Sequence, residues 1–409
     1  MMGRSSGAAD RVGGDVDAGY GKVADAFRAN LTGGREVGAA LAVYRDGVKV
    51  VDLWGGYRCG VTQEPWGEDT VVNLFSTTKG LSALAIAVAV SRGHLDYDAT
   101  VTQYWPEFAL AGKADVTVRQ LLSHQAGLAA IDTPLTLRTL AEPSTLSAAL
   151  AAQRPAWTPG TRHGYHAITL GWYESELLRR ADPAHRSLGR YFAEELAHPL
   201  DLDLFIGLPP SVDRRRVAHL HGWSRPRLLL HLNAMPPRFV AAMMNPRSLS
   251  TRAFNNPKQL GTLTAFNRED LRSLEIPAAN GIGTARSVAK AYGAAASGGA
   301  ALDLKPSVIE ELVGPATPPT RGRREEVLRV ETNFSLGFFK PFPSFTFGSS
   351  DQAFGTPGAG GSFGFADPDT GVGFAYAMNK CGFHLWNDPR ELVLRHALFH
   401  DVLKTRPQA

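Results

Sequence analysis

The feature that most constrains this chain is an apolar run over residues 81–90, which directly follows the small and polar residues of 76–80. This pattern predicts a helix that opens near Ser76 and closes at residues 91–93. Because Ser76 and Lys79 are three residues apart, such a helix places both side chains on one face of its first turn. The first N–H groups of a helix have no partner inside it, and the helix dipole favours negative charge at this end. Ser76 is therefore a candidate nucleophile.

Lys79 is the matching candidate base. A lysine that is buried beside the positive end of a helix loses affinity for its proton, and its neutral amine can accept the proton of a hydroxyl group. The Ser-x-x-Lys pattern is loose, however, and the chain contains a second match at Ser287 and Lys290. That match lies inside a helical pattern, with no small-residue approach before the serine. We therefore favour Ser76 and keep Ser287 as the alternative.

Composition limits the classes of protein to consider. The chain has 409 residues, of which 44% are hydrophobic and 20% charged, with a formal net charge of +4. These values are ordinary for a globular protein, and the length predicts a large core with two structural lobes. Positive charge is scattered, and the short arginine runs at 214–216 and 321–324 have acidic neighbours or turn residues. We therefore expect no nucleic-acid partner.

Further classes are excluded by what the sequence lacks. Cys59 and Cys381 are too few for a disulfide framework, and no cluster of His, Cys, Asp or Glu has metal-ligand spacing, so we expect neither a metal nor a cofactor. No apolar run is long enough to span a membrane. Residues 1–19 are rich in Gly, Asp and Ser and have no apolar signal-peptide region. We expect these residues to be disordered, and the cytoplasm is the default location.

Strand patterns at both ends of the chain enclose a helical middle. Runs at 39–44 and 48–56 flank Arg45-Asp46-Gly47, which is a strong hairpin signal. Strand patterns return over 334–339, 354–366 and 372–379, and a final helix is predicted over 390–403. The sequence therefore predicts an α+β fold. Its mostly antiparallel sheet comes from both ends of the chain and is flanked by N- and C-terminal helices.

The predicted lobe boundaries follow from this order. Residues 20–95 and 280–409 form the sheet lobe, and residues 96–279 form an inserted, mainly helical lobe. Within the helical lobe, residues 223–257 mix proline, methionine and phenylalanine. Such a segment is either a helical loop packed on the core or a mobile apolar cover over an acyl site, where methionine adapts to varied ligands.

Two later segments are also candidates for the chemistry. Tyr165 lies on a turn-rich loop, residues 159–167, that enters a helix. It could reach a cleft between the lobes and relay protons near a lysine, or it could simply pack at the boundary. Residues 356–361 are rich in glycine, which lets backbone N–H groups approach a ligand. No Gly-Lys-Ser/Thr follows, so a phosphate loop fits badly, whereas an edge strand that offers one N–H to an oxyanion fits well.

Taken in order, these motifs resemble a known family. Ser76-Thr77-Thr78-Lys79, then a Pro-Gly-Thr-x-x-x-Tyr segment ending at Tyr165, then a late glycine-rich strand, are similar to the serine β-lactamase-like superfamily. That group includes class C β-lactamases, D-alanyl-D-alanine carboxypeptidases and family VIII carboxylesterases. Residues 121–128 also resemble the family's Leu-Leu-x-His-x-x-Gly-Leu turn, in which the histidine, here His124, is structural. The likeness runs from about residue 38 to residue 403.

The resemblance implies acyl transfer through a covalent acyl-enzyme on Ser76. Lys79 and Tyr165 would carry the serine proton to the leaving group and later activate water. The oxyanion would be held by the N–H of Ser76 and by an N–H of the late strand, where Ala359 aligns with the residue after the family's Lys-Thr-Gly element. The residues implied to bind the oxyanion and the substrate are Ser76, Ala359, Gly358 and Gly360.

Two departures from the family pattern narrow the predicted activity. Penicillin-recognising members usually carry Tyr-x-Asn, but the third position here is Ala167, which cannot hydrogen-bond a substrate amide through its side chain. In place of Lys-Thr-Gly the chain has Thr356-Pro357-Gly358, which carries no charge for a substrate carboxylate. Losing a charged hydrogen bond costs about 1.5–3 kcal/mol, or roughly ten- to a hundredfold in binding. Many family VIII esterases share both departures.

We therefore predict a carboxylesterase for neutral, small to medium acyl esters, with a small-molecule ester as its partner and no predicted oligomeric state. An acyltransferase would use the same acyl-enzyme, and only product analysis separates the two. A weak β-lactamase or D-alanyl-D-alanine peptidase is a further alternative. A non-catalytic binding protein is the least favoured, because it has no need to keep Ser76, Lys79 and Tyr165 together.

Overall fold

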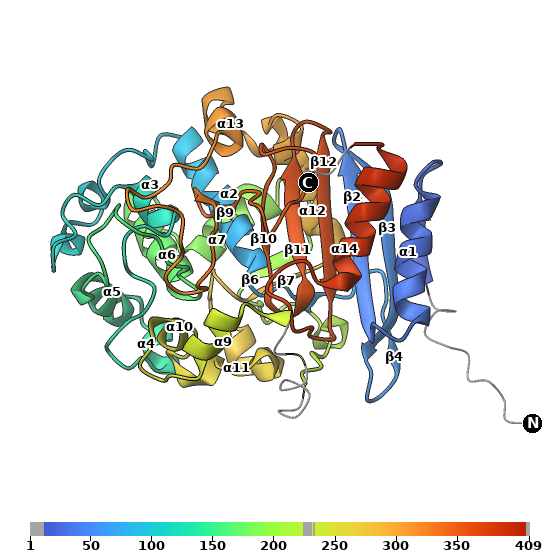
Figure 1. Cartoon of the computed structure of the whole chain (residues 1–409), viewed down its shortest axis with the longest axis horizontal. Helices are drawn as coiled ribbons and strands as arrows, with labels where there is room; N and C mark the ends of the chain where they lie inside the picture. Colours follow the sequence, from blue (N-terminus) through green and yellow to red (C-terminus); the bar gives the residue numbers. More distant parts are fainter. Residues whose placement is uncertain (1–11, 224–230, 232–233, 406–409) are drawn as a thin grey trace, which may run out of the picture.

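In the computed structural model, which describes residues 12–223, 231 and 234–405, strands from both ends of the chain form one nine-stranded antiparallel sheet (Figure 1). Its strand order is β1-β3-β2-β12-β11-β10-β9-β8, and β4 pairs with β3 outside this path. The strands are β1 (Val12–Val16), β2 (Gly38–Arg45), β3 (Val48–Cys59), β4 (Glu64–Pro65), β8 (Phe334–Ser335), β9 (Phe338–Phe339), β10 (Phe354–Pro357), β11 (Phe363–Asp367) and β12 (Val372–Met378). The predicted α+β class with a mostly antiparallel sheet is confirmed.

The helices pack beside this sheet. Most of them come from the part of the chain between the N-terminal and the C-terminal strands. They are α1 (Gly21–Thr32), α2 (Thr77–Ser91), α3 (Val118–Leu122), α4 (Leu137–Ala141), α5 (Pro143–Ala152), α6 (Thr169–Ala181), α7 (Leu188–Phe192), α9 (Pro237–Met243), α10 (Leu249–Phe254), α11 (Glu269–Arg272), α12 (Ala285–Ala296), α13 (Pro306–Val313) and α14 (Pro389–His396). Two π-helical segments, Ala193–Ala197 and Ala397–Val402, continue α7 and α14. Short 3-10 turns connect several of these elements.

The two faces of the main sheet carry different helices. Gly364 of β11 faces α12 and the start of α2, whereas the ring of its neighbour Phe365 packs against Phe399 of the C-terminal π-helical segment, with centroids 5.9 Å apart. Successive strand residues point to opposite faces, so α2 and α12 cover one face. The α1 and α14 helices cover the other face, side by side (Figure 1).

Close packing against α12 depends on glycine. A methyl group added at Gly373 of β12 would meet the backbone nitrogen of Gly293 of α12 at 2.1 Å. Because no side chain separates the two backbones at this point, α12 can lie directly on the centre of the sheet. This contact helps to hold the helical face on which α2 also packs.

A second, three-stranded sheet supports the start of α2. Its strand order is β5-β7-β6, with β5 (Val72–Asn73), β6 (Leu204–Ile206) and β7 (Gly281–Gly283). Strand β5 runs almost directly into Ser76, and α2 itself is buried along its apolar run. The predicted helix over 81–90 is thus central to the core, and its first residues are fixed by strands from three distant parts of the chain.

One prediction about the N-terminus is wrong. Residues 1–19 were expected to be disordered, but Val12–Val16 form β1 and pair with β3 from Val51 to Gly55. The pairing uses backbone groups, which glycine also supplies, and Gly13 packs on the indole of Trp54. An edge strand such as β1 can therefore pair through its backbone hydrogen bonds even when few of its side chains are apolar. Residues 1–11 lie outside the described part.

The proline- and methionine-containing segment over 223–257 is partly outside the described residues, because 224–230 and 232–233 are not covered. Its described part contains α9 and α10, whose Phe239 and Phe254 rings pack 6.0 Å apart. Ser250 of α10 donates a hydrogen bond of 2.6 Å to the carbonyl of Val327. Whether the segment covers an acyl site stays a prediction. Within the described residues, no helix has the length and apolar character that crossing a bilayer requires.

Candidate active site

The chain presents Ser76 at a sharp bend between β5 and α2. Phe75, directly before it, has a left-handed backbone with a φ of 50°, which is uncommon for a bulky residue. Its ring packs edge-on against Phe266, with centroids 5.9 Å apart. Among residues 71–80, Ser76 is the only one that is not buried. Within the described residues its backbone N–H has no hydrogen-bond acceptor. Ser76 therefore has a reachable hydroxyl and an unused N–H at a helix start.

Lys79 lies one turn further along α2, and its amine has three neighbours. Nζ is 3.2 Å from Ser76 Oγ, 2.6 Å from the carbonyl oxygen of Ala167 and 2.9 Å from that of Ala278. A neutral amine has two N–H donors and one lone pair. The two carbonyls accept the two N–H groups, which leaves the lone pair for the hydroxyl of Ser76. This arrangement orients Lys79 as a proton acceptor.

Burial also favours the neutral form of Lys79. The side chain is completely buried, and loss of hydration lowers its pKa to about 7, while the negative charge of Glu174 acts in the opposite direction. Glu174 lies on α6, and burial raises its pKa to about 8, against the effect of the Lys79 charge. Both of its carboxyl oxygens lack a hydrogen-bond partner among the described residues. Sequence reasoning missed Glu174, because nothing in the α6 pattern distinguishes it from a surface glutamate.

Tyr165 completes the cluster. Its phenol hydrogen-bonds the Ser76 hydroxyl, and its ring centroid lies 4.8 Å from Lys79 Nζ. Burial raises the pKa of Tyr165 well above its ordinary value, and the Glu325 carboxylate adds to this rise. Lys79 rather than Tyr165 is therefore the group with an accessible basic form near neutral pH. The structure brings together Ser76, Lys79 and Tyr165, the three residues that the sequence analysis selected as catalytic.

The loop of Tyr165 is held by a buried carboxylate. Glu325 accepts hydrogen bonds from the backbone N–H groups of Tyr165, Val327, Leu328 and Arg329. Burial nevertheless raises its pKa to about 7. The ring of Tyr165 stacks on Phe334, with centroids 5.9 Å apart and planes 18° apart. These contacts fix both the backbone and the ring plane of Tyr165.

Two histidines beside Tyr165 form a neutral buried pair. His166 Nε2 accepts the N–H of Leu128 at 3.0 Å, so its proton is on Nδ1, which donates to Nδ1 of His124 at 3.0 Å. Burial lowers the pKa of His124, and that of His166 to about 3. His163 in turn bonds the carbonyl of Arg323 through Nε2. All three histidines are committed to structural contacts, which agrees with the structural role expected of His124.

The glycine-rich segment lies against the Ser76 bend. Ser362 Oγ donates to the carbonyl of Leu74 at 2.8 Å and lies 3.2 Å from the hydroxyl of Thr77. A methyl group on Gly358 would meet the same Leu74 carbonyl at 2.5 Å, so glycine permits this close approach. In the stretch 353–366, Ala359 is the only residue that is not buried. Ser76 and Ala359 are thus the half-buried positions of two otherwise buried segments that touch.

Two expectations for this segment need correction. Strand β10 is not an edge strand, because it lies between β11 and β9. Gly358 was assigned to the oxyanion, but its N–H donates to the carbonyl of Ser362 at 2.7 Å and is not free. The carbonyl of Gly360 accepts from Arg390 at 2.6 Å, and a methyl group on Gly360 would meet Met378 at 2.8 Å. Gly358 therefore shapes the turn, and Ala359 and Gly360 keep the role as predictions.

The two departures from the β-lactam-binding pattern have structural counterparts. Ala167 contributes its backbone carbonyl to Lys79 and has no side-chain amide to offer a substrate. Thr356 is completely buried beside Tyr292 and does not face solvent. The structure therefore supplies no charged group at the position where penicillin-recognising members bind a carboxylate.

The alternative nucleophile, Ser287, is engaged elsewhere. It is buried near the start of α12, where its Oγ accepts the N–H of Asp203 at 2.9 Å and the hydroxyl proton of Thr284 at 2.9 Å. Lys290 donates to the carbonyl of Leu200. The second Ser-x-x-Lys match is thus part of the connection between α12 and β6.

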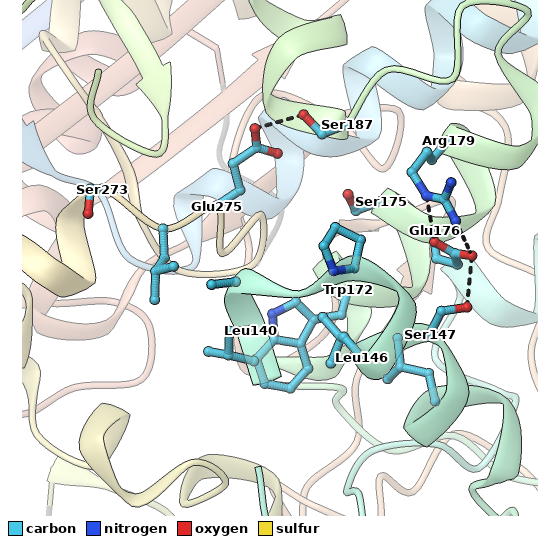
Figure 2. Close-up of a pocket in the computed structure, with 14 residues that line it drawn as sticks. Leu140, Leu146, Ser147, Trp172, Ser175, Glu176, Arg179, Ser187, Ser273 and Glu275 are labelled. Atoms are coloured by element: carbon cyan, nitrogen blue, oxygen red, sulfur yellow. Dashed lines mark hydrogen bonds and ion pairs between the residues drawn. The ribbon is translucent and has the colours of Figure 1, made fainter. Parts of the chain in front are cut away.

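A separate cavity of about 310 Å³ lies between α5, α6 and residues 273–275 (Figure 2). Leu140, Leu146 and Trp172 form much of its wall, and none of the three candidate catalytic side chains lines it. Its acidic groups already have partners: Glu275 accepts from Ser187 at 2.7 Å, and Glu176 accepts from Ser147 at 2.8 Å. The cavity is therefore distinct from the candidate active site.

The prediction that no cluster has metal-ligand spacing is also wrong. His396, His400 and Asp401 bring possible ligand atoms within 4.8 Å of one another at the end of α14. A helix over 390–403 was predicted from the sequence, but the four-residue spacing of His396 and His400, which places both imidazoles on one side of that helix, was not used. The group lies on the α1 and α14 side of the sheet, whereas α2, which carries Lys79, lies on the other side.

The comparison with known families is decisive at this point. A family model described as Beta-lactamase matches residues 23–397. The chain belongs to the beta-lactamase family. This places it among serine hydrolases that share the beta-lactamase fold, as the sequence motifs indicated.

Relatives of this family member carry esterase and penicillin-binding names. The "Esterase/beta-lactamase LipL" of Mycobacterium tuberculosis is 38% identical over 376 residues, which cover 90% of this chain and 83% of the relative. The crystal structure of a family VIII carboxylesterase is 37% identical, with a TM-score of 0.82 over 95% of this chain and 99% of that chain. A penicillin-binding protein homolog from Caulobacter crescentus is also 37% identical, with a TM-score of 0.82 over 94% of this chain and 98% of that chain.

Proposed function

We propose that this member of the beta-lactamase family is a carboxylesterase that cleaves small to medium, neutral acyl esters through a covalent acyl-enzyme on Ser76. The observation that carries the proposal is the environment of Lys79 Nζ, which has two carbonyl acceptors for its N–H groups and lies 3.2 Å from Ser76 Oγ. A buried amine with a lowered pKa is a suitable general base for a serine hydroxyl. The esterase names of relatives at 37–38% identity support this choice of substrate class.

In the acylation step, Ser76 Oγ attacks the ester carbonyl carbon while its proton passes to the lone pair of Lys79. The N–H groups of Ser76 and Ala359 hold the resulting oxyanion. The bond to the leaving alcohol then breaks. Tyr165 donates its phenolic proton to the alcohol oxygen and takes the proton of Lys79 in return, so that the acyl-enzyme carries a neutral Lys79. Water then attacks the acyl carbon through the same steps in reverse order.

The choice of esters over β-lactams rests on Ala167 and Thr356. A substrate with a carboxylate or an amide side chain finds no charged residue at Thr356 and no side-chain amide at Ala167. An unpaired charge in a buried site is costly, so neutral esters are favoured. The name of the LipL relative includes both activities, so hydrolysis of β-lactams is the second candidate. Transfer of the acyl group to an alcohol instead of water is a variant of the same chemistry.

Fluorophosphonate labelling of the intact protein, followed by mass mapping, tests the central step. We expect a single adduct on Ser76 and complete loss of p-nitrophenyl butyrate hydrolysis in Ser76→Ala. Ser287→Ala is the matched control and should keep the label and the turnover. An adduct on any other residue, or normal turnover in Ser76→Ala, would overturn the proposal. Nitrocefin turnover and product analysis with added alcohol then separate the three acyl-transfer activities.

A further inference from the structure

The C-terminal helix carries three potential metal ligands that the candidate active site does not use. Helix α14 ends at His396 and continues as the π-helical segment Ala397–Val402, which contains His400 and Asp401. Residues four apart on a helix lie on the same side. The imidazole rings of His396 and His400 accordingly lie parallel within 25°, with centroids 4.5 Å apart.

The exposure and hydrogen bonding of these side chains leave nitrogen atoms available. Both imidazoles are exposed, and Asp401 is half-buried. His400 Nδ1 lies 2.9 Å from Asp401 Oδ1. Because an ionised carboxylate only accepts hydrogen bonds, Nδ1 of His400 is the donor and its Nε2 carries the free lone pair. A carboxylate that holds one imidazole nitrogen in this way is the usual support of a metal-binding histidine.

We propose that His396, His400 and Asp401 form a surface site for one divalent transition-metal ion of the zinc, nickel and copper group. His396 and His400 supply the two nitrogen ligands, Asp401 orients the imidazole of His400, and water completes the coordination. Imidazole ligands suit these metals, whereas magnesium and calcium prefer sites made of oxygen ligands. The proposal does not depend on the esterase chemistry at Ser76.

The charges around the site set its strength. Lys22 of α1 is exposed and acts on Asp401 through its positive charge, so it opposes a bound cation. Arg395 points inward and is paired with Glu391 at 2.6 Å, so it does not compete for Asp401. Lys404 follows the π-helical segment and is exposed.

A bound ion would join two successive turns of a segment that is also part of the core. Leu398 and Phe399, between the two histidines, are buried, and Phe399 packs on Phe365 of the main sheet. Any ion that binds only the folded protein stabilises it by mass action. We therefore expect the metal to raise the melting temperature. Ester hydrolysis should stay unchanged, because the site and α2 lie on opposite faces of the sheet.

The test uses the full-length protein without an affinity tag, stripped of metal with a chelator that is then removed. Titration calorimetry with ZnCl₂ or NiCl₂ should show one equivalent bound, and MgCl₂ should show no binding. His396→Ala and His400→Ala should each abolish this stoichiometric binding. Asp401→Asn should weaken it about 10- to 100-fold, as expected for a carboxylate that supports a metal-bound histidine. Lys22→Ala should strengthen it.

The control is His198→Ala. His198 is another exposed histidine, and it follows the π-helical segment Ala193–Ala197 without a second histidine in the same turn. This variant should bind metal as the parent protein does. All the substituted side chains are exposed or half-buried, so the variants are expected to fold, and circular dichroism checks this. No stoichiometric zinc or nickel binding by the parent protein, or unchanged binding by the His396→Ala/His400→Ala double variant, would overturn the proposal.

Discussion

The hydroxyl of Ser362 donates a hydrogen bond of 2.8 Å to the carbonyl oxygen of Leu74, two residues before the candidate nucleophile. This bond joins the turn after β10 to the approach of α2, although the two residues are 288 positions apart in the chain. Ser76 and Ala359, whose N–H groups are assigned to the oxyanion, sit on the two joined segments. The separation of these two N–H donors therefore depends on a contact that neither donor makes itself.

Removing this contact should affect turnover more than substrate binding. We expect Ser362→Ala to lower kcat of ester hydrolysis roughly tenfold, with little change in KM, because misplaced oxyanion donors weaken the transition state selectively. The free energy of unfolding should fall by about 1 kcal/mol for the lost hydrogen bond. Ser147→Ala is the control, since Ser147 is also buried and donates to Glu176 at 2.8 Å. An equal loss of kcat in both variants would mean that the effect is general destabilisation.

The pH dependence of hydrolysis should report the protonation of Lys79. The proposed mechanism requires the neutral amine, and burial lowers the pKa of Lys79 to about 7. We therefore expect kcat/KM to rise with pH and to level off above about pH 7–8. The rate of fluorophosphonate labelling of Ser76, which does not involve an ester substrate, should show the same rise with pH. A labelling rate that is independent of pH between 5 and 9 would contradict the assignment of Lys79 as the base.

Lys79 and Tyr165 should act as one unit. Loss of a general base typically costs 10²–10⁴-fold, so Lys79→Ala and Tyr165→Phe should each lower kcat by about this factor. Tyr165→Phe keeps the ring that stacks on Phe334 and removes only the hydroxyl. The double variant should be little slower than the slower single variant. Additive losses would show that the two residues work independently, and near-normal turnover of Tyr165→Phe would leave Tyr165 with a packing role only.

Glu174 should make the folded protein less stable at alkaline pH. Its pKa is about 8 in the folded chain and near 4.5 as a free group, so the folded state resists ionisation. Stability is then lost progressively as pH rises from about 4.5 to about 8, by on the order of a few kcal/mol. Glu174→Gln should remove this loss, measured by urea denaturation at pH 5, 7 and 9. Glu174→Asp keeps a carboxyl group and should keep the pH dependence. An unchanged slope in Glu174→Gln would assign the pH dependence to other groups.

The elements that were predicted correctly are those whose formation depends on the pattern of apolar and polar side chains. The hairpin of β2 and β3, the late strands and the helix after Ser76 all follow from alternating or continuous apolar patterns. The meeting of Ser76, Lys79 and Tyr165 followed from the order of motifs. These three residues could be selected from the sequence because only a few residue types can act as a nucleophile or as its base, and here they occur in the order that the family shows.

Other parts could not be predicted, because backbone groups make them. The carbonyls of Ala167 and Ala278, which orient Lys79, are 88 and 199 residues away from it, and any residue type supplies a carbonyl. The same holds for β1, which pairs through its main chain. The position of Glu174 depends on which side of α6 meets α2, and this is decided by packing between segments that are distant in the sequence. The N–H of Ala359 was chosen by alignment, and the hydrogen bond of the Gly358 N–H became visible only in the folded turn.

The pairing of β2 with β12 has a consequence for folding of the chain during its synthesis on the ribosome. The N–H of Gly38, at the start of β2, bonds the side chain of Asn379, 341 residues later. At a synthesis rate of about 5–20 residues per second, β12 is made roughly 20 to 70 seconds after β2. The edge of β2 that pairs with β12 stays unpaired for this time. During that time an apolar strand edge is open to other chains. Slowing translation, or depleting the chaperones that shield such edges, should therefore reduce the yield of native protein without altering the finished molecule.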